Sequence, residues 1–137
     1  MAGSGGGCAC GSVRYQVEGP LRQVIACHCE QCRRSSGHFV AATATRRKYF
    51  HLLSSADLRW YEAVPGFRRG FCAVCGSSLF FERIGEDRMS IAAGSLDDAA
   101  GLSIAAHIFV DEAGAYYDVD DSVENSADRH CSVALPE

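Results

Sequence analysis

The sequence lacks an apolar run of the roughly 18 residues that a membrane-spanning helix needs, and it lacks an excess of positive charge. Its 13 basic residues stand against 17 acidic ones, and the net charge of −4 argues against general nucleic-acid binding, which requires a basic face. Residues 1–7 contain neither the apolar nor the basic segment of an export signal. We therefore expect a cytoplasmic protein that binds neither nucleic acid nor a membrane.

Helical periodicity is scarce, and the pattern is mostly that of β-strands. Apolar residues alternate with polar ones over residues 12–17, as in a half-buried strand. Further strand-like runs lie at residues 24–26, 39–45, 79–81, 89–93, 107–110 and 116–119. Residues 33–37 and 97–102 could each form one helical turn. With 137 residues, 47% of them apolar, and no repeat or long linker, the chain predicts one mainly β domain with few short helical turns.

Seven of the eight cysteines fall into three close groups, which indicates zinc chemistry. The groups are Cys8 and Cys10; Cys27, Cys29 and Cys32; and Cys72 and Cys75. The first and third groups together supply the four thiolates of a closed, structural zinc site. The middle group supplies three thiolates, which leave a fourth position open to water or a substrate. The count therefore predicts one metal ion for the fold and one for the chemistry.

Other uses of the cysteines explain less of the pattern. Disulfides need an oxidising compartment, and a thioredoxin-like redox pair accounts for a C-x-x-C motif alone rather than for three groups. Cys131 is left over. It could be a partly buried thiol, or it could complete the coordination of the three-cysteine group.

Several segments together resemble one known family. Cys-Ala-Cys-Gly at residues 8–11, Cys-His-Cys-Glu-Gln-Cys-Arg-Arg-Ser-Ser-Gly at 27–37 and Gly-Phe-Cys-Ala-Val-Cys-Gly-Ser-Ser-Leu at 70–79 stand in the order found there. Gly-Ser-Leu-Asp-Asp at residues 94–98 and His107–Ile108 continue the likeness. The chain is similar to the glutathione-dependent formaldehyde-activating enzymes, a family that includes centromere-protein-V-like domains.

The resemblance implies a β-tent fold and two zinc ions. The structural ion would be bound by Cys8, Cys10, Cys72 and Cys75, and the catalytic ion by Cys27, Cys29 and Cys32. The implied activity is the carbon–sulfur lyase chemistry that joins glutathione to formaldehyde as S-hydroxymethylglutathione. The implied zinc domain covers residues 7–121, between a flexible N-terminus at 1–6 and a C-terminal tail at 122–137. The family's tryptophan-containing last strand is replaced here by Tyr116-Tyr117-Asp118.

An open three-cysteine zinc site predicts a particular kind of substrate. Zinc keeps bound thiols deprotonated near neutral pH, so a substrate thiol could occupy the fourth position and add to an aldehyde carbon. Arg33, Arg34 and Arg69 are candidates for binding the carboxylates of a small anionic thiol such as glutathione. Alternatively, these arginines and the acidic last third of the chain form two solvated faces.

Other side chains have two interpretations each. His28 lies between two zinc ligands and is expected to point away from the metal, in a surface or hydrogen-bonding role or as a general acid or base. His107 is expected in the core or at a strand edge. Trp60 and Tyr61, in a segment expected to be a loop, belong either to the core or to the wall of the ligand pocket. The alternative to an enzyme is a zinc-stabilised binding module, in which Cys131 or a histidine fills the fourth position of the second site.

Overall fold

The computed structural model describes residues 3–137; residues 1 and 2, which belong to the segment expected to be flexible, lie outside the described part. One α-helix is present within this range, α1 at Glu30–Ser36, with 3-10 turns at Arg47–Tyr49, Ala93–Ser95 and Val110–Glu112. The strands are β1 Ser4–Gly7, β2 Arg14–Val17, β3 Val24–Cys27, β4 Val40–Thr45, β5 Phe50–Ser54, β6 Leu58–Val64, β7 Phe67–Cys72, β8 Ser78–Arg83, β9 Met89–Ala92, β10 Ile104–Ile108 and β11 Glu124–Asn125. The expected mainly β fold is confirmed.

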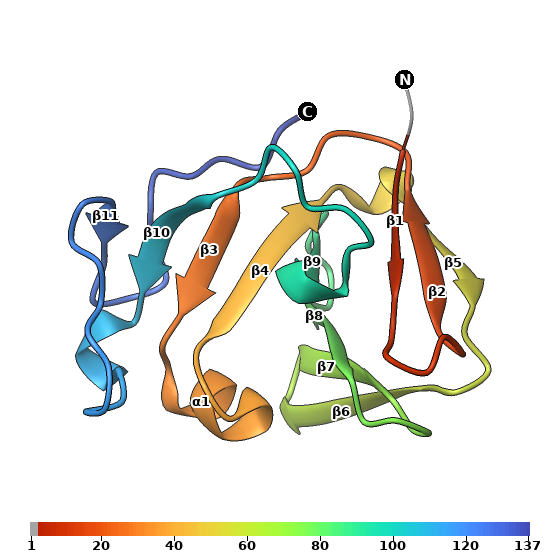
Figure 1. The fold of residues 1–137 in the computed structure, drawn as a ribbon, viewed down its shortest axis with the longest axis horizontal. Helices are drawn as coiled ribbons and strands as arrows, with labels where there is room; N and C mark the ends of the chain where they lie inside the picture. Colours follow the sequence, from red (N-terminus) through yellow and green to blue (C-terminus); the bar gives the residue numbers. More distant parts are fainter. Residues whose placement is uncertain (1–2) are drawn as a thin grey trace.

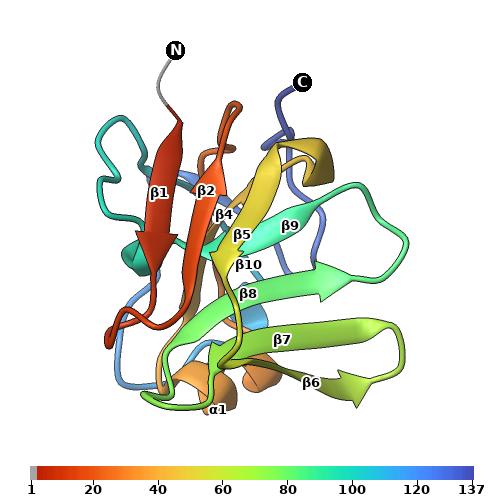
Figure 2. The same ribbon diagram turned by 90° about the vertical axis from the view of Figure 1, so that its right-hand side faces the viewer.

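The strands form two sheets that enclose the core. A small sheet has the order β1-β2-β5, and a large sheet has the order β11-β10-β3-β4-β9-β8-β7-β6. β10 runs parallel to β3, and the other neighbours from β3 to β6 are antiparallel. Figure 1 shows the small sheet beside one end of the large sheet, and Figure 2 shows its strands crossing β6–β9 at a steep angle.

The alternation in β2 explains why the small sheet packs where it does. Tyr15 and Val17 are fully buried against side chains of the large sheet, whereas Arg14 and Gln16 between them are partly exposed. Tyr15 packs edge-on against Phe80, with ring centroids 5.3 Å apart, and its hydroxyl lies 2.7 Å from Ser95 Oγ. The ring of Tyr15 thus packs between the two sheets while its hydroxyl keeps a hydrogen-bond partner.

Several local predictions were wrong. Residues 4–6, expected to be flexible, form β1 with Gly7 because their backbone pairs with β2. Trp60 and Tyr61 lie in β6 instead of a loop. Tyr116 and Tyr117 form a turn rather than a strand, and residues 97–102 form no helix. α1 begins three residues before the expected turn at Arg33, because Cys29 caps it.

The C-terminal segment, expected to be a tail at residues 122–137, contacts the large sheet. β11 pairs with β10, and the Pro136 carbonyl accepts a hydrogen bond of 3.0 Å from Arg46 Nε. This packing brings residues after β11 close to the large sheet. In the described part of the chain, no helix combines the length and apolar character needed to cross a bilayer.

Candidate metal centres and substrate cavity

Four cysteine sulfurs meet where the small sheet joins the large one. Cys8 and Cys10 follow β1, Cys72 ends β7 and Cys75 lies in the turn before β8, and their sulfurs all lie within 4.8 Å of one another. The Cys10 sulfur is 3.6 Å from that of Cys8 and 3.8 Å from that of Cys72. Four thiolates at about 2.3 Å from a tetrahedral zinc lie about 3.8 Å from one another. The donor set therefore fits zinc.

Hydrogen-bonding neighbours of this four-thiolate site lower the pKa of the Cys8 and Cys75 thiols. The Val13 N–H donates to Cys8 Sγ at 3.2 Å, and the Ser12 hydroxyl lies 3.2 Å from Cys10 Sγ. The Ser77 hydroxyl, 3.1 Å from the sulfur of Cys75, lowers the pKa of that thiol to about 5. No disulfide joins any of the eight cysteines in the described part of the chain, and seven of them lie in the two groups that could hold a metal ion.

Tight turns after the cysteine pairs make this geometry possible. Gly76, directly after Cys75, has φ +77°, and Gly11, directly after Cys10, has φ +83°. Residues with a Cβ atom rarely adopt such angles, so glycine is needed for the backbone to wrap around the sulfurs.

The three-cysteine group lies at the C-terminal end of β3 and in the helix that follows it. Cys27 is the last residue of β3, Cys29 is the N-cap of α1, and Cys32 lies in its first turn. The helix begins here because the Cys29 sulfur accepts the backbone N–H of Cys32 at 3.3 Å. It ends at Gly37, whose φ of 88° is left-handed. A short helix thus brings three sulfurs within 4.8 Å of one another.

The electrostatics of this triplet call for a cation. Hydrogen bonds from Cys27 and Cys32 lower the pKa of Cys29 to about 2, whereas the same contacts with Cys29 and Cys32, together with burial, raise the pKa of Cys27. Without a cation, one of the three sulfurs would be a thiolate that accepts hydrogen bonds from the other two, which would stay protonated. Three adjacent negative charges would repel one another. A divalent cation would allow all three to bind as thiolates.

The triplet opens into a cavity of about 470 Å³, which lies within the roughly 300–1,000 Å³ of small-molecule sites. Five arginines line it, and Glu86 is the one carboxylate within residues 3–137 that lines it. The arginines are Arg22, Arg69, Arg83, Arg88 and Arg129. Glu86 pairs with Arg88 at 2.9 Å and with Arg83 at 3.6 Å. The wall of the cavity therefore carries a net positive charge.

Arg22 is the most unusual of these residues because it is only 6% exposed. Its Nη2 donates to the Ala42 carbonyl at 2.8 Å and its Nε to the Gln23 carbonyl at 3.1 Å. Burial, with the nearby charge of Arg88, lowers the pKa of Arg22 to about 10, so it stays cationic near pH 7. Among the described residues, no ion pair joins Arg22 or Arg129 to a carboxylate.

The structure separates the three arginines expected to bind substrate. Arg69, on β7, lines the cavity, and its Nη2 lies 3.6 Å from Cys32 Sγ. Arg34 pairs with Glu30 at 3.0 Å on the solvent side of α1 and is 71% exposed. Arg33 and Arg34 are both absent from the described residues that line the cavity. Arg69 is therefore the member of this set placed to contact a ligand of the triplet.

His28 points away from the cavity, as expected from its position. It is 1% exposed; its Nδ1 lies 2.6 Å from the Tyr117 hydroxyl, and its Nε2 lies 2.8 Å from Nδ1 of buried His107. Burial, reinforced by the neighbouring His107 ring, lowers the pKa of His28 to about 4. Both ring nitrogens are occupied, so His28 supports the Cys27–Cys29 turn through hydrogen bonds.

Of the two aromatic candidates, Trp60 belongs to the core and Tyr61 to the wall of the cavity. Trp60 packs against the hydrophobic core, with its ring 6.1 Å from that of Phe80. Tyr61, the next residue, lines the cavity. Neighbouring residues of one strand face opposite sides of the sheet, so one joins the core and the other the ligand site.

A family comparison covers the part of the chain that contains both groups of sulfurs. The sequence model described as "Glutathione-dependent formaldehyde-activating enzyme" matches residues 4–112. The chain belongs to this family. A crystal structure of a Rhodobacter sphaeroides protein is similar, with a TM-score of 0.55 and 23% identity over 72% of this chain and 90% of that one. At that identity, the likeness concerns the fold alone.

In this member of the glutathione-dependent formaldehyde-activating enzyme family, two cysteine groups could hold metal ions, one with four sulfurs and one with three. Cys131 belongs to neither group, and among the described residues no histidine or carboxylate completes the triplet. The possibility that Cys131 supplies a fourth ligand is therefore not supported. The fourth position would face the arginine-lined cavity.

Four of the five arginines that line the cavity were not predicted from the sequence. Arg22 precedes β3, Arg83 ends β8, Arg88 precedes β9 and Arg129 follows β11. No local motif links them, because the pairing of distant strands brings them together. The one usable signal was Arg22, a charged residue beside the apolar run at 24–26.

Proposed function

We propose that the protein is a zinc-dependent enzyme of carbon–sulfur lyase type, which forms or cleaves the adduct of a small anionic thiol, such as glutathione, with a carbonyl compound. The observation that carries this proposal is the triplet of cysteines opening into a cavity lined by five arginines. Membership of the glutathione-dependent formaldehyde-activating enzyme family supports the same chemistry.

Charge explains why the thiol should be anionic. Zinc, when bound to the triplet, would act as a Lewis acid that favours the thiolate form of a substrate thiol. A further thiolate beside three cysteine thiolates adds negative charge, and Arg69 next to Cys32 offsets it. Arg22 and Arg129 line the cavity and pair with no carboxylate of the described residues, and we propose that they bind the substrate's own carboxylates.

The alternative role as a binding module required a fourth protein ligand at the triplet. The described residues supply three. A partner protein would also meet a cavity of small-molecule size instead of a flat face. Both observations favour the enzyme.

We expect glutathione to bind and S-methylglutathione not to bind, because a thioether cannot supply the thiolate that zinc prefers. Arg129→Gln should weaken glutathione binding roughly ten- to a hundredfold, the value of a charge-assisted carboxylate contact of about 1.5–3 kcal/mol. Calorimetry on the zinc-loaded protein measures both effects.

Arg34→Gln is the matched control, since it also removes one exposed arginine charge but lies outside the cavity. Its affinity for glutathione should stay within about twofold of wild type, as for a surface ion pair. A larger loss of glutathione affinity in Arg34→Gln than in Arg129→Gln would mean that the substrate's carboxylate binds at α1, as the sequence predicted. Equal binding of the two ligands, or binding of neither, would rule out the proposed function.

A further inference from the structure

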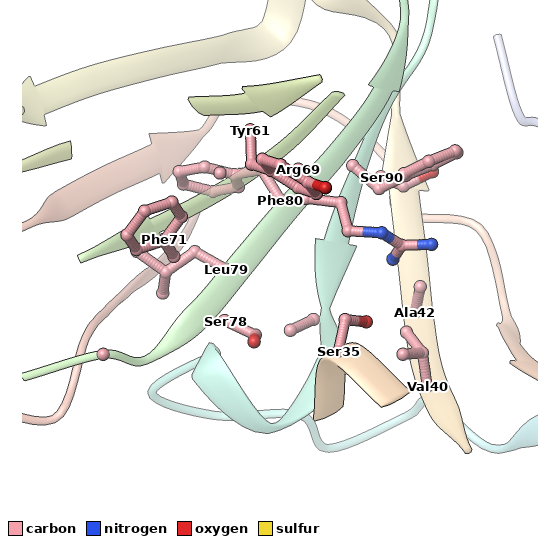
Figure 3. Close-up of a pocket in the computed structure, with 14 residues that line it drawn as sticks. Ser35, Val40, Ala42, Tyr61, Arg69, Phe71, Ser78, Leu79, Phe80 and Ser90 are labelled. Atoms are coloured by element: carbon pink, nitrogen blue, oxygen red, sulfur yellow. The ribbon is translucent and has the colours of Figure 1, made fainter. Parts of the chain in front are cut away.

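A second cavity adjoins the triplet cavity on the far side of Arg69. Its volume is about 300 Å³. Val40, Ala42, Tyr61, Arg69, Phe81 and Ser90 line both cavities. Figure 3 shows the Arg69 side chain reaching across toward Ala42 and Ser90, with Phe71 and Leu79 on the other side of the pocket. Arg69 thus stands at the boundary between two connected compartments.

The second cavity lies close to the metal-binding sulfurs. Ser35, which lines it, is one helical turn after Cys32, and its hydroxyl donates to the Cys32 carbonyl at 3.2 Å. Residues three apart on a helix are neighbours, with Cβ atoms about 5–6 Å apart. A group attached to a sulfur at the triplet could therefore extend past Arg69 into this space.

The chemistry of the two compartments differs. Among the residues that the structure describes, five arginines line the triplet cavity, whereas Arg69 is the one charged residue that lines the second cavity. Its other lining residues are apolar, aromatic or small, with Phe71, Leu79, Phe80 and Ala92 found in the second cavity only. Leu79 and Phe80 are buried parts of the core, so this wall is firmly held. Such a surface favours hydrocarbon over a charged group.

We propose that the second cavity binds an apolar substituent on the carbonyl partner, so that this protein acts on aldehydes larger than formaldehyde. This inference rests on the proposed function, because it places the thiol at the triplet. Formaldehyde has no substituent and would leave the second cavity unfilled. An alkyl or aryl aldehyde would fill it while its carbonyl carbon stays beside the sulfur.

The reaction balances without a further reactant. The substrate sulfur adds to the carbonyl carbon, a carbon–sulfur bond forms, and the carbonyl double bond opens to an alkoxide. The oxygen takes up the proton that the thiol released, and the product is a hydroxyalkyl thioether. Arg69, held over the Phe81 ring at 5.0 Å and near Cys32, is placed to donate a hydrogen bond to the oxygen as its charge develops.

The test compares acetaldehyde, butanal and hexanal, whose carbonyl carbons have similar intrinsic reactivity. The kcat/KM of the zinc-loaded protein with glutathione is measured from NMR exchange between each aldehyde and its adduct. Each methylene buried should raise kcat/KM roughly fourfold, so butanal should exceed acetaldehyde by roughly 15-fold. A flat or falling series, with glutathione still bound, would overturn this inference and leave the proposed function intact.

Two variants locate the effect. Ala92→Leu fills the second cavity and should reduce the ratio of butanal to acetaldehyde to near one, with glutathione affinity unchanged. Ala63→Leu, in the triplet cavity only, should preserve the ratio. The same loss of ratio in both variants would contradict the assignment of the second cavity.

Binding is also measured without reaction. Butyramide, whose carbonyl does not add thiols, should shift the amide NMR signals of Phe71 and Leu79 in the glutathione-bound protein more than acetamide does. These shifts should be lost in Ala92→Leu. Unchanged signals would refute occupation of the cavity, whereas failure of glutathione itself to bind would refute the proposed function first.

Discussion

Cys72→Ser should yield protein that is insoluble or that lacks fixed tertiary structure. Cys72 is fully buried at the end of β7, and its partners Cys8 and Cys10 lie in the small sheet's first turn. A structural zinc site contributes about 10–16 kcal/mol to the folding of small zinc domains, as much as or more than the 5–15 kcal/mol that separates typical folded and unfolded states. Losing one thiolate from such a site should therefore remove most of the net stability.

Soluble yield, zinc content and thermal unfolding of Cys72→Ser measure this effect. Cys131→Ser is the control, since it also replaces a cysteine but lies outside both sulfur groups. It should fold, bind two zinc ions and unfold within a few degrees of wild type, as expected for a change of less than about 1 kcal/mol. A soluble Cys72→Ser protein with wild-type stability would contradict a structural role for the four-thiolate site.

Cys29→Ser should have the opposite phenotype, with a preserved fold and at least a hundredfold loss of thiol binding. Cys29 caps α1 by accepting the Cys32 N–H, and serine is among the best N-cap residues, so the helix should survive. The main hydrophobic core, between β2 and strands β7–β9, does not include the triplet. The metal, however, loses one of three ligands, and the position that binds the substrate sulfur is lost with it.

Circular dichroism, zinc content and calorimetry with glutathione distinguish these effects. The variant should bind one zinc ion instead of two and keep a cooperative unfolding transition. Arg33→Gln, on the same helix but outside the cavity, should keep both zinc ions and glutathione binding. Unfolding of Cys29→Ser, or undiminished glutathione binding, would show that the two sulfur groups do not have separate roles.

The sequence predicted which cysteines lie close enough together to share a metal ion, because their spacing in sequence is local. Two cysteines with one or two residues between them, followed by Gly11 or Gly76, are typical of a metal-binding turn, whatever the rest of the fold. The division into four and three sulfurs also follows from counting, and it agrees with the sulfur geometry.

The substrate cavity could not be predicted in this way. Arg22 and Arg129 are 107 positions apart and meet only because β10 pairs with both β3 and β11. Arg33 and Arg34 directly follow Cys32 in sequence, which predicts that they bind substrate, but the turn of α1 directs Arg34 toward Glu30 and solvent. Sequence proximity predicts ligands to one ion better than it predicts the wall of a pocket built from several strands.

The strand predicted at residues 116–119 does not form, because its tyrosine side chains make tertiary contacts instead. The Tyr116-Tyr117 segment has the composition of a strand, but the Tyr117 hydroxyl binds buried His28 and the Tyr117 ring packs against His38, with centroids 4.7 Å apart. These contacts hold the segment in a turn beside His28 and His38, which flank α1 in sequence. Tertiary packing therefore overrides local β propensity here.

X-ray absorption at the zinc edge tests most directly whether the triplet is open to a substrate thiol. Without thiol, the average number of sulfur ligands per zinc should lie between three and four, because one site has four cysteines and the other has three. Glutathione should raise this average to four, and S-methylglutathione should not change it. Four sulfurs per zinc before any thiol is added, or no rise with glutathione, would contradict an open catalytic position at Cys27, Cys29 and Cys32.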